Sequence, residues 1–91
     1  MRYRLVFTEQ YNRRALRFIK RHPELKKQYL KTLQLLTLNP QHPSLRLHAL
    51  KGRLKPLQSV SINLSYCITL ELLIKEEQII LMNVGDHDAV Y

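Results

Sequence analysis

The stretch that decides the fold is Ser59-Val60-Ser61-Ile62-Asn63-Leu64-Ser65-Tyr66-Cys67-Ile68-Thr69-Leu70-Glu71-Leu72. Apolar or aromatic side chains hold the even positions, and small or polar side chains hold the odd ones. Because successive side chains of a strand point to opposite faces, this period of two predicts strands with one buried and one open face. A bend within residues 63–65 makes the stretch a hairpin. The open face, lined by small polar groups, suits an elongated anionic ligand.

Two further strands are predicted outside this hairpin. Residues 78–84 follow a polar turn at 75–78 and are almost wholly apolar. Near the N-terminus, Tyr3, Leu5 and Phe7 alternate with Arg2 and Arg4, which indicates a short strand with one basic face.

Between these strands the apolar period changes to that of helices. Thr8 can cap a first helix, whose buried face carries Tyr11, Ala15, Phe18 and Ile19. A second helix starts near Pro23 and stops at Asn39-Pro40. Its core side carries Leu25, Tyr29, Leu33 and Leu36.

The predicted order is therefore β-α-α-β-β-β. It indicates an α+β fold, an antiparallel sheet with an N-terminal helical hairpin packed on one face. A length of 91 residues predicts one domain spanning 1–91.

The charge is distributed unevenly along the chain. Residues 1–55 hold 14 of the 15 Lys and Arg residues against only Glu9 and Glu24, a net charge of +12, whereas residues 56–91 carry a net charge of −4. A lopsided basic field favours a polyanionic ligand, and nucleic acid is the first candidate. An acidic, partly disordered protein partner could use the same field. A basic surface kept only for solubility is the alternative.

Cysteine and apolar content indicate the compartment. Cys67 is the only cysteine, which fits a reducing cytoplasm and excludes a disulfide framework. The sequence has no secretion signal, and its longest apolar run is far shorter than the roughly 18 residues that span a bilayer. We expect a cytoplasmic protein with no membrane partner.

The familiar motifs for cofactor chemistry are missing. His22, His42, His48, His87 and Cys67 lack zinc-ligand spacing, so no metal site is predicted. The sequence contains neither a glycine loop for phosphates nor a serine nucleophile elbow. We expect no cofactor.

Two clusters remain that could carry chemistry. Residues 46–55 (RLHALKGRLK) combine a histidine with several cations, and residues 85–91 (GDHDAVY) end a strand with an imidazole and a phenol. If both flank the open face, two histidines and several cations surround one groove, which is enough for metal-free RNA cleavage. Histidine suits proton transfer near neutral pH, and Arg and Lys stabilise charge on the phosphorane.

Each of these residues also has an ordinary structural explanation. His48 is more often a surface or capping histidine, His87 an exposed loop residue, and Tyr91 a terminal aromatic docked on the core. His22 and His42, each followed by proline, are interpreted as turn residues. The arginines within 13–21 are most often the solvated side of a helix.

Four segments resemble the RelE/ParE superfamily of toxins from toxin–antitoxin systems, and most of all its YafQ-type branch of messenger-RNA interferases. They are His48-Ala49-Leu50-Lys51-Gly52-Arg53-Leu54, Ser59-Val60-Ser61-Ile62-Asn63, Tyr66-Cys67-Ile68 and residues 83–91. The ending with Gly85, His87 and Tyr91 is the most discriminating of them. The specific motifs cover about residues 46–91, and the strand order and basic charge agree over the whole chain.

The resemblance implies a metal-independent endoribonuclease that cuts messenger RNA on the ribosome and inhibits translation. It implies neutralisation by a cognate antitoxin and binding of operator DNA only through the antitoxin complex. It places His48, His87 and Tyr91 at catalytic positions. The residues expected to contact substrate are Arg46, Lys51, Arg53, Lys55, Asn63 and Cys67.

The sequence departs from the family at Cys67, where relatives commonly have an arginine that contacts the scissile phosphate. The site either does not use this position, or Arg46, Lys51 or Arg53 substitutes, or this toxin is weakened. Two other functions therefore stay open: a ParE-like DNA gyrase inhibitor without nuclease chemistry, and an attenuated toxin that binds only antitoxin and operator DNA.

Overall fold

The first strand and helix form where the sequence predicts them. In the computed structural model, which describes residues 2–50 and 56–86, β1 (Arg4–Phe7) leads directly into α1 (Glu9–Arg21). Thr8 caps this helix, because its Oγ1 accepts a hydrogen bond from the Tyr11 amide at 3.1 Å. Glu9 follows in the first turn, where the helix dipole favours a negative charge.

The second helix completes the predicted hairpin. A 3₁₀ turn, η1 (Pro23–Leu25), leads into α2 (Lys26–Leu38), which ends at Asn39. The two helices join through aromatic contacts. The hydroxyls of Tyr11 and Tyr29 lie 2.8 Å apart in a buried hydrogen bond, and the rings of Phe18 and Tyr29 have centroids 6.3 Å apart.

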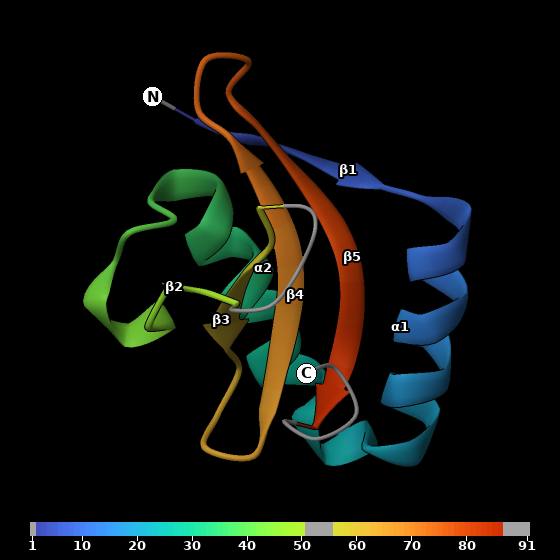
Figure 1. Cartoon of the computed structure of the whole chain (residues 1–91). Coiled ribbons are helices and arrows are strands. Elements are labelled where there is room, and N and C mark those ends of the chain that lie inside the picture. Colours follow the sequence, from blue (N-terminus) through green and yellow to red (C-terminus); the bar gives the residue numbers. More distant parts are fainter. Residues whose placement is uncertain (1, 51–55, 87–91) are drawn as a thin grey trace.

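The remaining strands follow a second 3₁₀ turn, η2 (Pro43–Leu45). They are β2 (His48–Ala49), β3 (Gln58–Ser61), β4 (Tyr66–Leu73) and β5 (Gln78–Asp86), and the sheet order is β1-β5-β4-β3-β2. The predicted bend at 63–65 closes the β3–β4 hairpin, since the Ile62 and Asn63 amides both donate to the Tyr66 carbonyl. Figure 1 shows α2 behind the strands and α1 alongside β5.

The α+β prediction is confirmed, with one correction to strand direction. Neighbours from β2 to β5 pair antiparallel, but β1 pairs parallel to β5, so the sheet is mixed. Alternation of side chains specifies which face is buried and carries no information on strand direction. The short strand β2 was also not predicted, because its two residues are too few to show a period.

One core joins both helices to one face of the sheet. Its buried members are Tyr11, Phe18, Tyr29, Leu33, Leu36, Leu45, Val60, Ile62, Ile68, Leu70, Ile79, Leu81 and Val84. The even-numbered apolar residues of β3 and β4 face this core, as the pattern predicts. No helix in the described part of the chain is long and apolar enough to cross a membrane.

The opposite sheet face is not open as predicted. Ser59, Cys67 and Thr69 alternate away from the core, yet their exposed fractions are 0%, 2% and 3%. These side chains are small and lie on β3 and β4, which are flanked by strands on both sides. Alternation shows which face a side chain points to and not how much of it is exposed, so polarity alone did not predict their burial.

Candidate active site

The strand register places four polar residues in one row across the sheet. His48 lies opposite Ser59, Ser59 opposite Thr69, and Thr69 opposite Asn83. Directly opposite residues of antiparallel strands share a face, so the four side chains lie on the face away from the core. At about 4.8 Å between strands, the row spans roughly 14 Å. It is an elongated polar track with an imidazole at one end.

Two hydroxyls in this row are buried without partners. Among the described residues, neither Ser59 Oγ nor Thr69 Oγ1 makes a hydrogen bond. An unpaired buried hydroxyl costs roughly 1–3 kcal/mol of stability, so such groups are rare away from functional positions. The polar row therefore has two unpaired hydroxyls between His48 and Asn83.

His48 is held in one orientation by the backbone. It lies on β2 with an exposed side chain, and its Nδ1 is 2.8 Å from the carbonyl oxygen of Arg46. A carbonyl can only accept, so Nδ1 carries the proton of this bond. In the neutral ring the lone pair then lies on Nε2, which is the arrangement of a general base.

Arg46 holds this carbonyl in place through an uncommon backbone conformation. It ends η2 with φ of 52° and ψ of 48°, in the left-handed region. A residue with a Cβ pays roughly 1–2 kcal/mol there. Its side chain is exposed. Arg46 thus combines a cation at the surface with a backbone bend that orients His48.

Asn63 and Cys67 occupy different surroundings from those predicted. Asn63 Oδ1 accepts from the amides of Ser65 and Tyr66 at 2.8 and 2.9 Å, so this oxygen holds the β3–β4 turn. Cys67 lies opposite Ser61 on β3 and Gly85 on β5, next to the polar row, and is buried. Substrate contact by either residue stays a prediction.

Several predicted site residues lie outside the described residues: Lys51, Arg53, Lys55, His87 and Tyr91. Their roles stay predictions from the resemblance. Of the two predicted proton-transfer residues, the structure therefore describes His48 alone. Within residues 2–50 and 56–86, no group of three or more His, Cys, Asp or Glu side chains is arranged to hold a metal ion.

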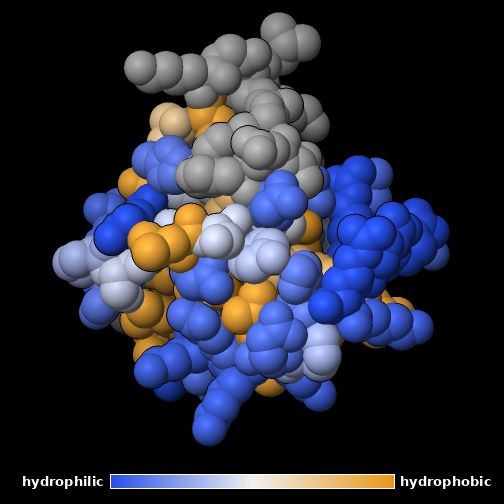
Figure 2. Space-filling view, turned by 90° about the horizontal axis from the view of Figure 1, so that it is seen from below, coloured by the Kyte–Doolittle hydropathy of each residue, from blue (hydrophilic) through white to orange (hydrophobic). Residues whose placement is uncertain are grey.

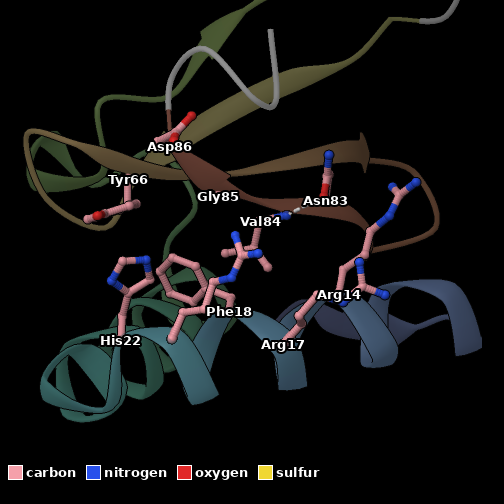
Figure 3. A pocket seen from close by; sticks show the side chains of 10 residues that line it. Arg14, Arg17, Phe18, His22, Tyr66, Asn83, Val84, Gly85 and Asp86 are labelled. Atoms are coloured by element: carbon pink, nitrogen blue, oxygen red, sulfur yellow. Dashed lines mark hydrogen bonds between the residues drawn. The ribbon is translucent and has the colours of Figure 1, made fainter.

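A second polar region, which the sequence did not predict, lies beside α1. A cavity of about 260 Å³ separates α1 from the end of β5. It is lined by three arginines, three rings and residues of β5: Arg14, Arg17, Arg21, Phe18, His22, Tyr66, Asn83, Val84, Gly85 and Asp86. Figure 3 shows Arg14, Arg17, Phe18 and His22 rising from the helix toward the strands, and Tyr66 facing them from the strand side. The basic stripe of α1 is the feature of the sequence that could have indicated this cavity. Such a stripe is most often only the solvated face of a helix.

Comparison with known proteins identifies the fold. No family profile matches the chain, and no curated protein matches it in sequence. Solved structures do match. The YafQ toxin in the Escherichia coli DinJ–YafQ toxin–antitoxin complex superposes with a TM-score of 0.79 at 17% identity, over 100% of this chain and 99% of that one.

Two further structures show the same similarity. A metal-bound toxin from Helicobacter pylori matches with a TM-score of 0.76 at 21% identity, over 100% of both chains. The toxin–antitoxin complex RelBE2 from Mycobacterium tuberculosis matches with a TM-score of 0.60 at 15% identity, over 96% of this chain and 100% of that one. The chain therefore has the fold of these solved toxins, and YafQ is among its best structural matches.

Proposed function

We propose that this protein is the toxin of a type II toxin–antitoxin system and that it cleaves messenger RNA without a metal, on the ribosome. The observation that carries the proposal is the oriented imidazole of His48 at the end of the polar row. Its Nδ1 lies 2.8 Å from the Arg46 carbonyl oxygen, which fixes the tautomer of the neutral ring with the lone pair on Nε2, the form that can accept a proton. The fold shared with solved toxins and the charge of the N-terminal half both agree with this function.

The proposed reaction is an internal transfer within RNA. A histidine takes the proton of a 2′-hydroxyl, and the oxygen attacks the adjacent phosphorus. The bond from phosphorus to the 5′-oxygen breaks, and a second group protonates that oxygen. The products are a 2′,3′-cyclic phosphate and a 5′-hydroxyl. We assign the two proton transfers to His48 and His87, in either order, and orientation of the substrate to Tyr91.

Cations and the polar row complete the proposed site. Arg46, Lys51, Arg53 and Lys55 stabilise the charge on the phosphorane. Ser59 and Thr69, which are 0% and 3% exposed, form the floor of the site, and Asn63 stands at the turn that follows β3. Cys67 contributes to the floor of the site through its size, because a side chain that is 2% exposed presents no donor to substrate.

We further propose that an antitoxin neutralises the protein. The matched YafQ and RelBE2 structures are complexes of toxin and antitoxin. A basic N-terminal half attracts an acidic, partly disordered segment that folds on binding. Operator DNA would be bound only through that complex. Because its substrate is translated messenger RNA, the toxin would act in the cytoplasm.

The decisive experiment is cleavage of a ribosome-bound messenger RNA by the purified chain, with and without a chelator. We expect site-specific cuts that persist in the chelator and end in a cyclic phosphate. His48→Gln and His87→Ala should each reduce the rate by about 10²–10⁴-fold.

His42→Gln is the matched control. His42 is also exposed and also bonds through Nδ1, but to Ser44 in η2, away from the polar row. If the wild type cuts no RNA and instead inhibits DNA supercoiling, the protein is a gyrase inhibitor. If it does neither but binds an antitoxin, the chain is an attenuated binding module.

A further inference from the structure

The cavity beside α1 has features that the cleavage site does not explain. It lies between α1 and the end of β5 and meets the polar row only at Asn83, whereas His48, Ser59 and Thr69 do not line it. Its volume of about 260 Å³ is slightly below the roughly 300–1,000 Å³ of sites that enclose a small molecule. This size fits one unit of a longer ligand better than a whole enclosed metabolite.

One wall of the cavity is a line of arginines. Arg14, Arg17 and Arg21 occur at helical intervals of three and four, so they share a face of α1 over about 10 Å. Arg14 Nη1 donates to the Met82 carbonyl at 3.1 Å, which anchors one guanidinium against β5. Strongly hydrophilic side chains gather in Figure 2 on the side where α1 lies in Figure 1. Such a line binds a chain of phosphates.

The far end of the cavity is aromatic. The rings of His22 and Tyr66 have centroids 4.6 Å apart, and Phe18 packs against Tyr66 at 5.4 Å. His22 and Tyr66 are only half-buried, so their rings remain accessible (Figure 3). A ring surface next to guanidinium groups is the arrangement by which proteins hold unpaired bases.

The charge at the rim favours RNA over an acidic peptide. Asp86 lines the cavity next to Tyr66, its partner across β4 and β5, and so places a negative charge at the aromatic end. A peptide rich in carboxylates is repelled there, whereas a nucleobase is uncharged and leaves its phosphates to the arginines. The arrangement therefore separates a site for phosphate from a site for a ring.

We propose that this cavity binds one unpaired nucleotide of single-stranded RNA, with the base on Tyr66 and His22 and the flanking phosphates on Arg17 and Arg21. The inference adds a second RNA contact to the proposed function. It does not require cleavage, because His48 lies at the other end of the polar row, and Asn83 is the one member of that row that also lines the cavity. Its role is to anchor RNA.

The test uses a single-stranded 2′-O-methyl oligonucleotide of about ten residues, which lacks the attacking hydroxyl and survives binding measurements. Arg17→Gln is compared with Arg13→Gln, since Arg13 lies on the same helix outside the cavity and pairs with Glu9 at 3.9 Å. We expect Arg17→Gln to reduce the slope of log K against log salt by about 0.7. Arg13→Gln should change it less.

The aromatic part is tested with Tyr66→Leu and Tyr66→Phe. We expect Tyr66→Leu to weaken binding by roughly 5- to 150-fold and Tyr66→Phe to keep it. An abasic chain of the same length should bind both variants equally. This control also shows that Tyr66→Leu remains folded.

Three results would overturn the inference: equal effects of Arg13→Gln and Arg17→Gln, an equal loss with the abasic chain, or polyglutamate binding that depends on Tyr66 and Arg17 in the same way. Each measurement is repeated with His48→Gln, which removes the proposed chemistry. If the wild type cleaves no RNA but both it and His48→Gln bind the oligonucleotide, the proposed nuclease function is wrong and the proposed RNA anchor is kept.

Discussion

The imidazole of His48 hydrogen-bonds through Nδ1 to the carbonyl of Arg46, two residues earlier, at 2.8 Å. This bond depends on the left-handed conformation of Arg46, which has φ of 52°. Backbone strain of this kind persists where the surrounding structure requires it, and it often marks functional positions. Arg46 therefore has two separable roles: its backbone orients the histidine, and its guanidinium is available to phosphate.

Arg46→Gly separates these roles. Glycine adopts positive φ without steric cost, so the His48 contact is kept and the guanidinium alone is lost. We expect the free energy of unfolding to stay equal or rise by up to about 1 kcal/mol, because relief of strain exceeds or balances the greater freedom of the unfolded chain. RNA cleavage should fall by roughly 10- to 100-fold. Chemical denaturation and the ribosome cleavage assay measure the two effects.

Glu77→Gly is the matched control for this experiment. Among the described residues, Glu77 is the other non-glycine residue with positive φ, at 55°, and it lies in the turn between β4 and β5. It should show the same change in stability with no change in cleavage. Unchanged cleavage in Arg46→Gly would remove the Arg46 side chain from the site.

Thr69→Val tests whether the unpaired hydroxyls serve function. The valine has the same shape and removes a buried Oγ1 that has no partner among the described residues. We expect the unfolding free energy to rise by about 1–2 kcal/mol, because the buried hydroxyl has no partner, while cleavage falls, because a group kept at a cost in stability indicates that the polar row serves function. Thermal denaturation and cleavage rates check the two halves of the prediction.

The control for this substitution is Thr32→Val on α2. Thr32 is also buried, but its Oγ1 donates to the Gln28 carbonyl at 2.9 Å. Removing a satisfied hydroxyl should lower stability or leave it unchanged, and cleavage should not respond. A stabilised Thr69→Val variant with full activity would show that the polar row has no part in catalysis.

The sequence predicted the local structure well because local signals determine it. Thr8 caps α1, Asn39 ends α2, and the alternation from Val60 to Leu72 shows which side chains face the core. Each of these features depends on residues within a few positions of one another. The α+β class follows from their order along the chain.

The arrangement of the candidate site could not be predicted in the same way, because it is formed by contacts between residues far apart in the sequence. The opposition of His48 to Ser59 and of Thr69 to Asn83 arises from strand register. The cavity beside α1 forms where Tyr66 on β4 meets His22, which the sequence suggested only as a turn residue. Proximity of this kind requires the tertiary structure.

Cys67 gives a third prediction, since the toxin family that the sequence resembles commonly has an arginine at this position. Its side chain is 2% exposed and lies between Ser61 and Gly85. We expect Cys67→Ala to cleave RNA at the wild-type rate, because the thiol makes no contact with substrate. Cys67→Arg should lower stability by roughly 1–3 kcal/mol through overpacking and should not raise the rate. A faster and equally stable Cys67→Arg variant would show instead that the protein is attenuated at this position.

The buried hydroxyl pair between the helices predicts the behaviour at high pH. Burial raises the pKa of both Tyr11 and Tyr29, and for Tyr11 the neighbouring Tyr29 hydroxyl raises it further. An unfolded tyrosine loses its proton near pH 10. Above that pH the unfolded chain binds fewer protons than the folded chain, so stability is complete below about pH 10 and falls as the pH rises.

Tyr11→Phe removes one member of this pair. Near neutral pH it should lower the free energy of unfolding by about 1–3 kcal/mol, because it leaves the Tyr29 hydroxyl buried without its 2.8 Å partner. Above pH 10 its stability should fall less steeply than that of the wild type, since one titrating group is gone. The double variant with Tyr29→Phe should cost less than the sum of the single changes, because no orphaned hydroxyl remains. Additive losses, or an unchanged slope above pH 10, would show that the two hydroxyls are not coupled.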